Sequence, residues 1–580
     1  MSSDPRLADI EAQLEDVVSN NGRPSDKKES IGTILVGLAS ERAELFHGSD
    51  GKTYATIMVA DHVETCLIRS GHFRRWLAQL AYDTLGKAPG GQALADATAV
   101  LDGRAAFAGD ELPVSVRLGG DDAAVHLDLG DASWGAVEIT AAGWKIVRDP
   151  AVRMRRPSGF APLPVPVRGG SLDELRRFVN VATDTDFRLL VGFLVGALRA
   201  RGPYPVLILH GEQGSAKSTT ARIVRGVLDP SIAPVRSAPR NEHELAISAE
   251  NQRVLAFDNL SHLPGWYSDA LCRLATGGGF AVRTLYENQE ETIFRAQRPV
   301  ILNGIEDIAT RADLLDRALV LYLPTIRRVR SEKALLREFE LAHPRILGAL
   351  LDAASCAMRN ISTTSLDVLP RMADFAEWVV AAEPTLPWSR GEFMRAYTDN
   401  RASAHELTLE ASPIGGPIRE LAAAGGFEGK AKELLARLEE ITEEKTTKGR
   451  EWPKSPRGLT GALRRIAPTL RATGIEVEIA DHRASRHPIR IRAQETVATV
   501  DTVSAEPKPD LPSSPETDRK GPETDRKGDR SEGSDSAPGD RSYRSDRSSR
   551  PRSYEGNGFE PATEEQLDLA DRIANRWGPA

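Results

Sequence analysis

Hydrophobic and polar positions in the first third of the chain alternate between strand and helix periods. Strand-like patterns are found at 54–59 and 64–70, and helical patterns follow at 73–85 and 92–103. Short-period patterning then returns, and a Pro-rich stretch at 155–170 has the composition of an interdomain linker. The pattern predicts an N-terminal α+β accessory domain over 31–165, preceded by a short flexible terminus at 1–30.

The middle of the chain has the pattern of an α/β domain. A strand rich in Leu and β-branched residues runs over 205–210 and leads through GEQGSAKS into a helical segment. Further apolar strands are expected at 253–260, at 298–304 and just before Pro324. We expect an α/β core over 170–330, followed by a helical connector over 331–412.

The last third changes character twice. Three short helices and two strands are predicted at 414–425, 429–440, 455–470, 475–480 and 488–492. Helices followed by a hairpin in this order suggest a winged helix over 413–495. The stretch 496–560 is polar, contains the repeat PETDRKG twice, and predicts a disordered linker. A capping box then opens a predicted helix at 561–580, which could bind a replication protein or be a weakly ordered tail.

Composition and charge narrow the class of protein. With 580 residues the chain is too long for one hydrophobic core, and it holds no apolar run long enough to span a membrane. The acidic N-terminus lacks a signal-peptide core, so we expect a cytoplasmic protein with no membrane partner. The three cysteines lie far apart, which excludes a disulfide scaffold. Because the net charge is −8, any nucleic-acid surface has to be a local patch.

The segment after the strand at 205–210 carries the pattern of a phosphate-binding loop. A strand, a Gly-containing turn, a lysine, a hydroxyl and a helix occur in that order, so backbone N–H groups form an anion nest beside Lys217. We expect ATP to bind at Gly211, Glu212, Gln213, Gly214, Ser215, Ala216, Lys217, Ser218 and Thr219. Ser218 would hold Mg²⁺. Ala216 departs from the usual glycine, which bears on how tight the loop is, and its methyl group would be tolerated if the backbone there stays in a helical φ/ψ region.

Polar residues at the ends of the following strands complete a candidate catalytic set. Asp258 ends an apolar strand and fits a second ligand for Mg²⁺. Asn259 follows where related ATPases carry a glutamate, so it can orient a water but cannot act as its base, a role for which Glu287 is one candidate. Asn303 fits a polar sensor near the γ-phosphate, and Arg317 fits an arginine finger. Arg311 is better explained as a surface residue.

In this order the motifs resemble those of superfamily 3 helicases, most of all the phage and plasmid primase-helicases related to the poxvirus enzyme. The resemblance rests on the loop, FDN, LCRLATGGGFAVRTLYENQEETIF, RPVILNG and LLDRALVLYLP, and it covers about 205–325. It implies an AAA+-like P-loop NTPase that forms a homo-oligomeric ring, hydrolyses ATP and moves on single-stranded DNA. The family's pore hairpin would include Arg283. No primase signature occurs in the N-terminal part.

The predicted winged helix is basic within an acidic chain. Residues 450–492 contain ten Lys or Arg and four Asp or Glu. Such an asymmetry is typical of a nucleic-acid surface, although a basic face of a protein-binding module has the same composition. We expect duplex DNA to contact Arg457, Arg464, Arg465, Arg483 and Arg486.

Acidic residues of the N-terminal part offer a second candidate site. Asp121, Asp122, Asp128 and Asp131 could form a metal cluster of a primase, but turn and edge-strand carboxylates explain them better.

The sequence as a whole predicts a multidomain α/β protein with a P-loop NTPase core, an N-terminal α+β domain, a helical connector and a C-terminal winged helix. The predicted function is that of an ATP-dependent, helicase-like ATPase in replication of a phage, prophage or plasmid, with ATP and Mg²⁺ as cofactors. Two alternatives stay open. One is an ATP-driven switch or loader that binds DNA or a replication protein without unwinding, and the other is a nucleotide-binding initiator with little hydrolysis.

Overall fold

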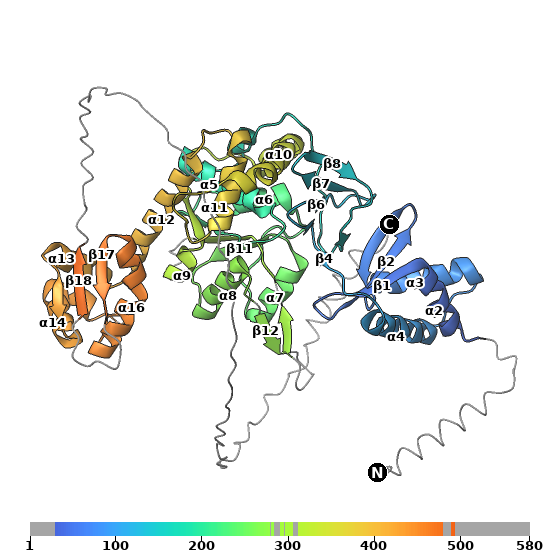
Figure 1. Ribbon diagram of the computed structural model, residues 1–580, viewed down its shortest axis with the longest axis horizontal. Coiled ribbons are helices and arrows are strands. Elements are labelled where there is room, and N and C mark those ends of the chain that lie inside the picture. Colours follow the sequence, from blue (N-terminus) through green and yellow to red (C-terminus); the bar gives the residue numbers. More distant parts are fainter. Residues whose placement is uncertain are drawn as a thin grey trace, which may run out of the picture. The chain divides into compact units, whose positions relative to one another are not determined.

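The computed structural model of the protein describes most of the chain up to residue 493 (Figure 1). The described residues are 29–278, 296–304, 311–449, 451–479 and 489–493, with the backbone alone of 280–283 and 291–294. The predictions for residues 1–28, 496–560 and 561–580 lie outside them. The described part is a mixed α/β protein with several sheets, as the pattern predicted.

The N-terminal part is a small antiparallel sheet with helices packed on it. Its elements are α2 (Ile31–Arg42), β1 (Ala43–His47), β2 (Thr53–Val59), β3 (His62–Leu67), α3 (Gly71–Leu85) and α4 (Gly91–Phe107). The sheet order is β1-β2-β3, and the buried side chains of this part, among them Leu35, Phe73 and Leu101, form a core of their own. The strands and helices predicted here are confirmed, with their ends displaced by a few residues.

A second antiparallel sheet follows and belongs to a different core. Its strands are β5 (Leu118–Gly120), β6 (Val125–Asp128), β7 (Ala136–Thr140) and β8 (Gly143–Val147), and β4 (Val114–Ser115) pairs with β9 (Arg153–Met154) beside it. Leu127 and Ile139 pack in the same apolar cluster as the helices of the central part. The indole N–H of Trp144 also donates to Asp352 at 2.8 Å. The sheet is therefore anchored to the central part.

Four parallel strands form the central sheet. They are β10 (Val206–His210), β11 (Leu255–Leu260), β14 (Val300–Gly304) and β15 (Ala318–Tyr322), in the order β11-β14-β10-β15. The helices of this region are η1 (Leu172–Arg177), α5 (Asp184–Ala197), α6 (Lys217–Leu228), α7 (Glu242–Asn251), α8 (Gly265–Thr276) and α9 (Ala312–Leu315). A hairpin, β12 (Phe280–Arg283) with β13 (Glu291–Phe294), follows α8. All the expected core strands are present.

The central sheet is buried on both faces, as expected for parallel strands. Along β10, Leu207 and Leu209 point into the cluster formed with α5, α6 and α10 (Glu332–Asn360). Val206 and Ile208 point into the opposite cluster with α7 and α8. This alternation follows from the two-residue period of a strand, and it explains why these strands have continuous apolar sequences. Polar groups are therefore placed at the strand ends.

Helices dominate 331–412, as predicted. After α10 come α11 (Ala373–Ala382) and α12 (Glu392–Ala411), with the short turns η2 (Ile361–Thr363) and η3 (Glu383–Thr385). The Pro-rich stretch packs on α10, where the N–H of Val167 donates to the carbonyl of Pro344. A Cβ at Gly348 would lie 1.9 Å from the carbonyl oxygen of Val167, so only glycine permits this approach.

The C-terminal part has its own core of helices and a three-stranded sheet. Its elements are α13 (Gly415–Ala423), β16 (Phe427–Gly429), α14 (Ala431–Ile441), α15 (Glu444–Thr447), α16 (Pro456–Ala472), β17 (Ile475–Glu478) and β18 (Ile489–Ala493). The three predicted helices and both predicted strands are confirmed. The structure adds β16, which pairs with β18. Its three residues are too few to show a period, so the sequence pattern could not reveal it.

Candidate functional site

The loop that joins β10 to α6 has a backbone that depends on its small residues. Gly211 has φ 154°, and a Cβ there would lie 2.5 Å from the carbonyl oxygen of Leu323. Ala216 has φ 57° and ψ 32°, which is the left-handed region. Ala216 therefore adopts a conformation that costs an L-residue about 1–2 kcal/mol.

Lys217 begins α6 and turns its side chain back over the loop. Its Nζ donates to the carbonyl oxygens of Gly211 and Glu212, each at 2.7 Å, and lies 3.4 Å from Ser215 Oγ. Desolvation lowers the pKa of the Lys217 ammonium, while the negative charge of Asp258 opposes this shift. The loop thus concentrates N–H groups, a helix N-terminus and one cation.

The polar strand ends meet beside this loop. The Ser218 hydroxyl lies 3.0 Å from Asp258 Oδ1, although 40 residues separate the two in the sequence. On the neighbouring strand, Asn303 Oδ1 accepts the backbone N–H of Asn259 at 2.9 Å. Parallel strands bring their carboxyl ends to one edge, which is why residues from α6, β11 and β14 come together.

Asn303 leaves one polar group unsatisfied. Its side chain is 1% exposed, and within the described residues its Nδ2 has no hydrogen-bond partner. A buried donor without a partner costs about 1–3 kcal/mol.

Arg317 does not contact the loop of its own chain through any described hydrogen bond. Its Nη1 donates to the carbonyl of Asp313 in α9 at 2.6 Å, and its buried Nε has no partner within the described residues. Arg311 donates to the Gly265 carbonyl and pairs with Asp269 at 2.9 Å. The surface role expected for Arg311 is consistent with these contacts.

The sequence analysis missed the residue that ties the loop to the segment after β15, the strand next to β10. Asn180 precedes α5, and its Nδ2 donates to the carbonyl oxygens of Ser215 at 2.9 Å and of Pro324 at 2.6 Å. Thr325 adds a bond from its hydroxyl to Glu212 at 3.2 Å. No local pattern distinguishes Asn180, because its partners are defined only by the fold.

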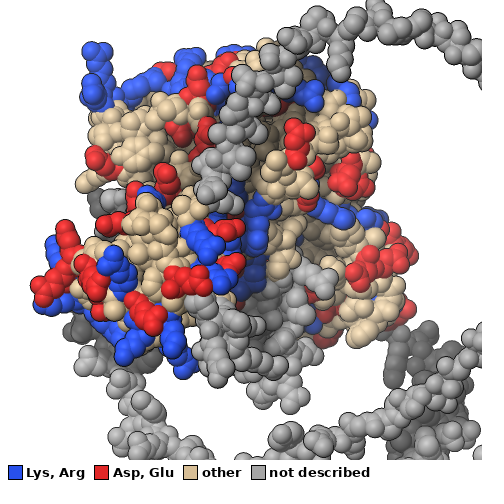
Figure 2. Space-filling view, turned by 60° about the vertical axis from the view of Figure 1, so that its left-hand side comes forward, with Lys and Arg blue, Asp and Glu red and all other residues tan. Residues whose placement is uncertain are grey.

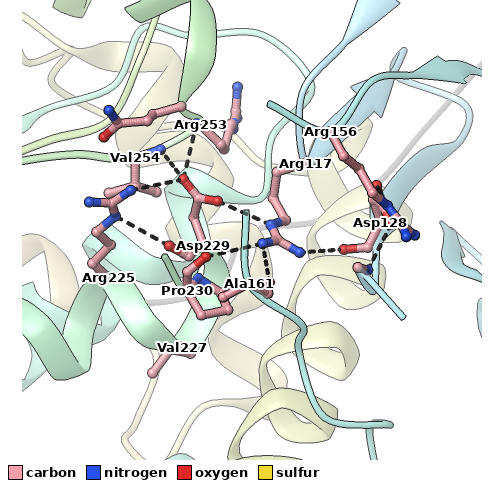
Figure 3. A network of polar contacts seen from close by, with 12 residues as sticks. Arg117, Asp128, Arg156, Ala161, Arg225, Val227, Asp229, Pro230, Arg253 and Val254 are labelled. Carbon is pink, nitrogen blue, oxygen red and sulfur yellow. Dashed lines mark hydrogen bonds and ion pairs between the residues drawn. The ribbon is translucent and has the colours of Figure 1, made fainter. Parts of the chain in front are cut away.

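A buried ion pair at the other end of α6 was also missed (Figure 3). Arg117 is fully buried, and its Nε donates to Asp229 Oδ1 at 3.0 Å. The other Asp229 oxygen accepts the backbone N–H groups of Arg253 and Val254, which lead into β11. Burial lowers the pKa of the Arg117 guanidinium, and Asp229 counteracts this. The pair links the β5–β8 sheet to the helix and the strand that carry Lys217 and Asp258.

The candidate acidic cluster is explained by local bonds. Asp121 accepts the N–H groups of Ala123 and Ala124, and Asp128 accepts the N–H of Gly130. Both Asp128 oxygens also bond to Arg156. No group of three potential metal ligands occurs in the part of the chain that the structure describes.

The residues expected to bind DNA are placed only in part. Arg457 is exposed on α16, whereas Arg464 and Arg465 line a cavity of about 600 Å³ that also includes Arg311 of the central part. Arg283 lies in the β12–β13 hairpin, but its side chain is outside the described residues, as are Glu287, Arg483 and Arg486. Figure 2 shows a face on which Lys and Arg gather in a central hollow.

The fold and the candidate site define the chain as one kind of mixed α/β protein. The chain is a mixed α/β multidomain protein in which a lysine-bearing loop, a carboxylate and a buried amide meet at the carboxyl end of a parallel sheet. Residues 172–407 match the family described as actinomycete integrative conjugative element replication protein, and residues 414–507 match the AICE RepA C-terminal domain. Together these matches take in more than half of the chain. It belongs to this family of replication proteins.

Solved structures resemble the chain only weakly. Two apo structures described as the A form of the NrS-1 C-terminal region have TM-scores of 0.36 and 0.35, with 11% and 12% sequence identity. They cover 81% and 80% of this chain and 100% of their own. At these scores the likeness carries no argument. No curated protein matches the sequence. Among the described residues, no helix has the length and apolarity to cross a membrane.

Proposed function

We propose that the chain is an ATP-dependent, helicase-like ATPase that acts on DNA during replication of an integrative conjugative element. The observation that carries this proposal is the contact of Ser218 with Asp258, 3.0 Å apart, directly beside Lys217. A hydroxyl and a carboxylate next to an anion nest are the parts that nucleotide hydrolysis requires.

These two oxygens fit Mg²⁺. The ion prefers hard oxygen ligands and is usually held by one or two protein groups together with substrate phosphates. Ser218 and Asp258 would hold it, and the ion would neutralise charge that develops on the phosphates. Lys217 would exchange its bonds to the loop carbonyls for bonds to phosphate oxygens, since its ammonium lies over the loop.

Asn303 and Asn259 would orient the attacking water. The amide oxygen of Asn303 is already used by the N–H of Asn259, so its NH₂ group is the part available to a ligand. Asn259 has φ 57°, a left-handed conformation that asparagine accepts more readily than most residues. Neither amide can take a proton, so these residues position the water without acting as its base.

Because neither Asn303 nor Asn259 can act as a base, a second candidate is also favoured, a nucleotide-binding initiator with little hydrolysis. The residue beside Asp258 is an amide, and a site without a base turns over slowly. The C-terminal part serves DNA binding in both proposals, because α13, α14 and α16 with the β16–β18–β17 sheet have the order of a winged helix, and its exposed Arg457 suits phosphate contacts.

We expect Lys217→Ala and Asp258→Ala each to lower DNA-stimulated ATP turnover at least about a hundredfold, because electrostatic stabilisation supplies most of phosphoryl-transfer catalysis. Lys333→Ala, at an exposed position of α10, is the matched control and should keep full activity. Phosphate release measures turnover, and a forked-duplex assay separates a helicase from a switch. Full turnover in the Lys217 variant would remove the proposal. Absent turnover in the wild type, with ATP bound, would favour the initiator.

A further inference from the structure

A cavity of about 600 Å³ lies where the N-terminal part meets the central part. One wall is formed by β3 and the start of α3, from Glu64 to Arg75, and another by 155–158. The third wall comes from the central part, with Arg236 and Asn251. Nothing in the proposed ATPase uses this cavity, so it calls for an explanation of its own.

The lining of the cavity is strongly cationic. Four arginines, Arg75, Arg155, Arg156 and Arg236, face a single carboxylate, Glu64. That carboxylate is already engaged, because His62 and His72 approach it at 2.9 and 2.7 Å.

Two of the arginines are fixed as parts of the wall. Arg156 pairs with Asp128 at 2.6 Å, as Figure 3 shows, and stacks on Trp134 with its guanidinium 3.9 Å from the ring centroid. Arg155 donates to Asn251 Oδ1 and to the carbonyl of Glu250, which ties this wall to α7. The side chains of Arg155 and Arg156 are therefore held in place by their own contacts.

The guanidinium groups of the other two arginines are available to a ligand. Within the described residues, the side chains of Arg75 and Arg236 form no hydrogen bond or ion pair. A Cβ on Gly71 would lie 3.5 Å from Arg75 Nη1, so this guanidinium lies at the N-terminus of α3, whose first residues also line the cavity. A helix N-terminus with an adjacent guanidinium is suited to an anion with several oxygens, such as phosphate.

We infer that this cavity binds the phosphodiester backbone of single-stranded nucleic acid. Gly71, His72, Arg75 and Ser158 are exposed, so the cavity is open to solvent and a polymer can enter it. The cavity has the volume of a pocket for a small molecule. A space of this size admits a single strand and excludes a double helix. The inference goes beyond the proposed ATPase and does not depend on it.

The position of Arg236 connects this site to the central sheet. Its N–H donates to the carbonyl of Ala256, and its carbonyl accepts the N–H of Asp258. These bonds hold the backbone of Arg236 along β11, so the segment that presents its guanidinium to the cavity is fixed to the central sheet.

The test compares two double variants of the full chain without nucleotide. Arg75→Ala with Arg236→Ala should weaken binding of a fluorescent oligothymidylate roughly tenfold and make the dependence of log K on log salt shallower by about 1.4, because two phosphate contacts are lost. Arg74→Ala with Arg240→Ala is the matched control, since these exposed arginines do not line the cavity, and it should bind like the wild type. Anisotropy gives the affinity, and thermal melting checks folding.

Wild-type affinity and salt dependence in the folded Arg75/Arg236 variant would overturn the inference. A second measurement distinguishes the two possible sources of phosphate, a nucleic-acid strand and a free nucleotide. If that variant instead loses binding of ATP, measured in a Lys217→Ala background, while keeping the oligonucleotide, the cavity holds a free nucleotide and the nucleic-acid assignment is wrong. Cross-linking of a 4-thiothymidine strand to residues 155–158 would support it directly.

Discussion

Two single residues in the candidate site carry left-handed backbone conformations, which few non-glycine residues adopt. Ala216 and Asn259 both have φ 57°, and they stand next to Lys217 and Asp258 respectively. Each left-handed L-residue costs about 1–2 kcal/mol, less for asparagine. Ala216 is the N-cap residue of α6, just before Lys217, and Asn259 lies in β11 just after Asp258. The rest of the sheet is regular.

Another single residue packs against helix α6, which carries Lys217 and Ser218. His343 of α10 is 6% exposed, and its Nε2 lies 3.1 Å from the carbonyl of Val227 in α6. Burial lowers the pKa of His343 to about 4. The folded state therefore holds this imidazole neutral under conditions in which the unfolded chain protonates it.

This shift predicts an acid-sensitive contribution to stability. The unfolded state binds a proton near pH 6.5, whereas the folded state does so only near pH 4, so stability is complete above pH 6.5 and falls by about 3 kcal/mol towards pH 4. His343→Gln keeps a donor for Val227 but does not titrate. The free energy of unfolding of this variant, measured in urea, should lose less between pH 7 and pH 4 than that of the wild type. Equal losses would contradict the neutral, buried histidine.

At the scale of elements, α6 is held at both ends. Its first residue closes over the loop, and its C-terminal carboxylate, Asp229, pairs with Arg117 of the β4–β5 turn. The same carboxylate orients the start of β11 through two backbone bonds. The ion pair therefore connects the C-terminal end of α6 with the start of β11, the two elements that carry Ser218 and Asp258.

Asp229→Asn should destabilise the protein by about 3–5 kcal/mol, because it leaves the buried Arg117 charge without its counter-ion. Glu444→Gln breaks an exposed pair with Lys448 and serves as the control, with an expected loss below about 0.5 kcal/mol. Urea unfolding of the full chain measures both. A loss below about 1 kcal/mol for Asp229→Asn would show that the pair does not link these elements.

At the scale of the whole molecule, we propose that a neighbouring copy of the chain completes the ATPase site. Arg317 follows α9, and its described bond is to Asp313 rather than to the loop. Its Nε is buried and has no partner among the described residues. In the homo-oligomeric ring that we propose from the sequence resemblance, this arginine would face the nucleotide of a neighbouring copy, where such a residue raises the rate roughly 10³–10⁵-fold.

Arg317→Ala should therefore keep ATP affinity and lose turnover. Mixing it with an excess of Lys217→Ala should restore part of the activity, since some interfaces then pair an intact loop with an intact arginine. Turnover of the mixture, compared with each variant alone, is the measurement. A protein that stays monomeric with ATP and DNA and turns over fully without Arg317 would exclude the ring.

Local patterns were sufficient for the elements and for the loop. The strand at 205–210, the turn 211–218 and the helix after it are encoded within two dozen residues, so periodicity and glycine placement predict them directly. The same holds for α13, α14 and α16 in the C-terminal part. The Ala216 conformation was not predicted, because whether the backbone there is left- or right-handed depends on how the loop packs under Leu323 and Asn180.

What only the tertiary structure decided are the pairings between distant residues. Asn180 reaches Ser215 across 35 positions, Ser218 reaches Asp258 across 40, and Arg117 reaches Asp229 across 112. Side-chain chemistry makes each residue able to bond, but the sequence does not say with which of many partners. The parallel sheet and its covering helices select the partners by bringing strand ends and helix ends to common edges. The cationic cavity of Arg75 and Arg236 arises in the same way, from segments that share no local pattern.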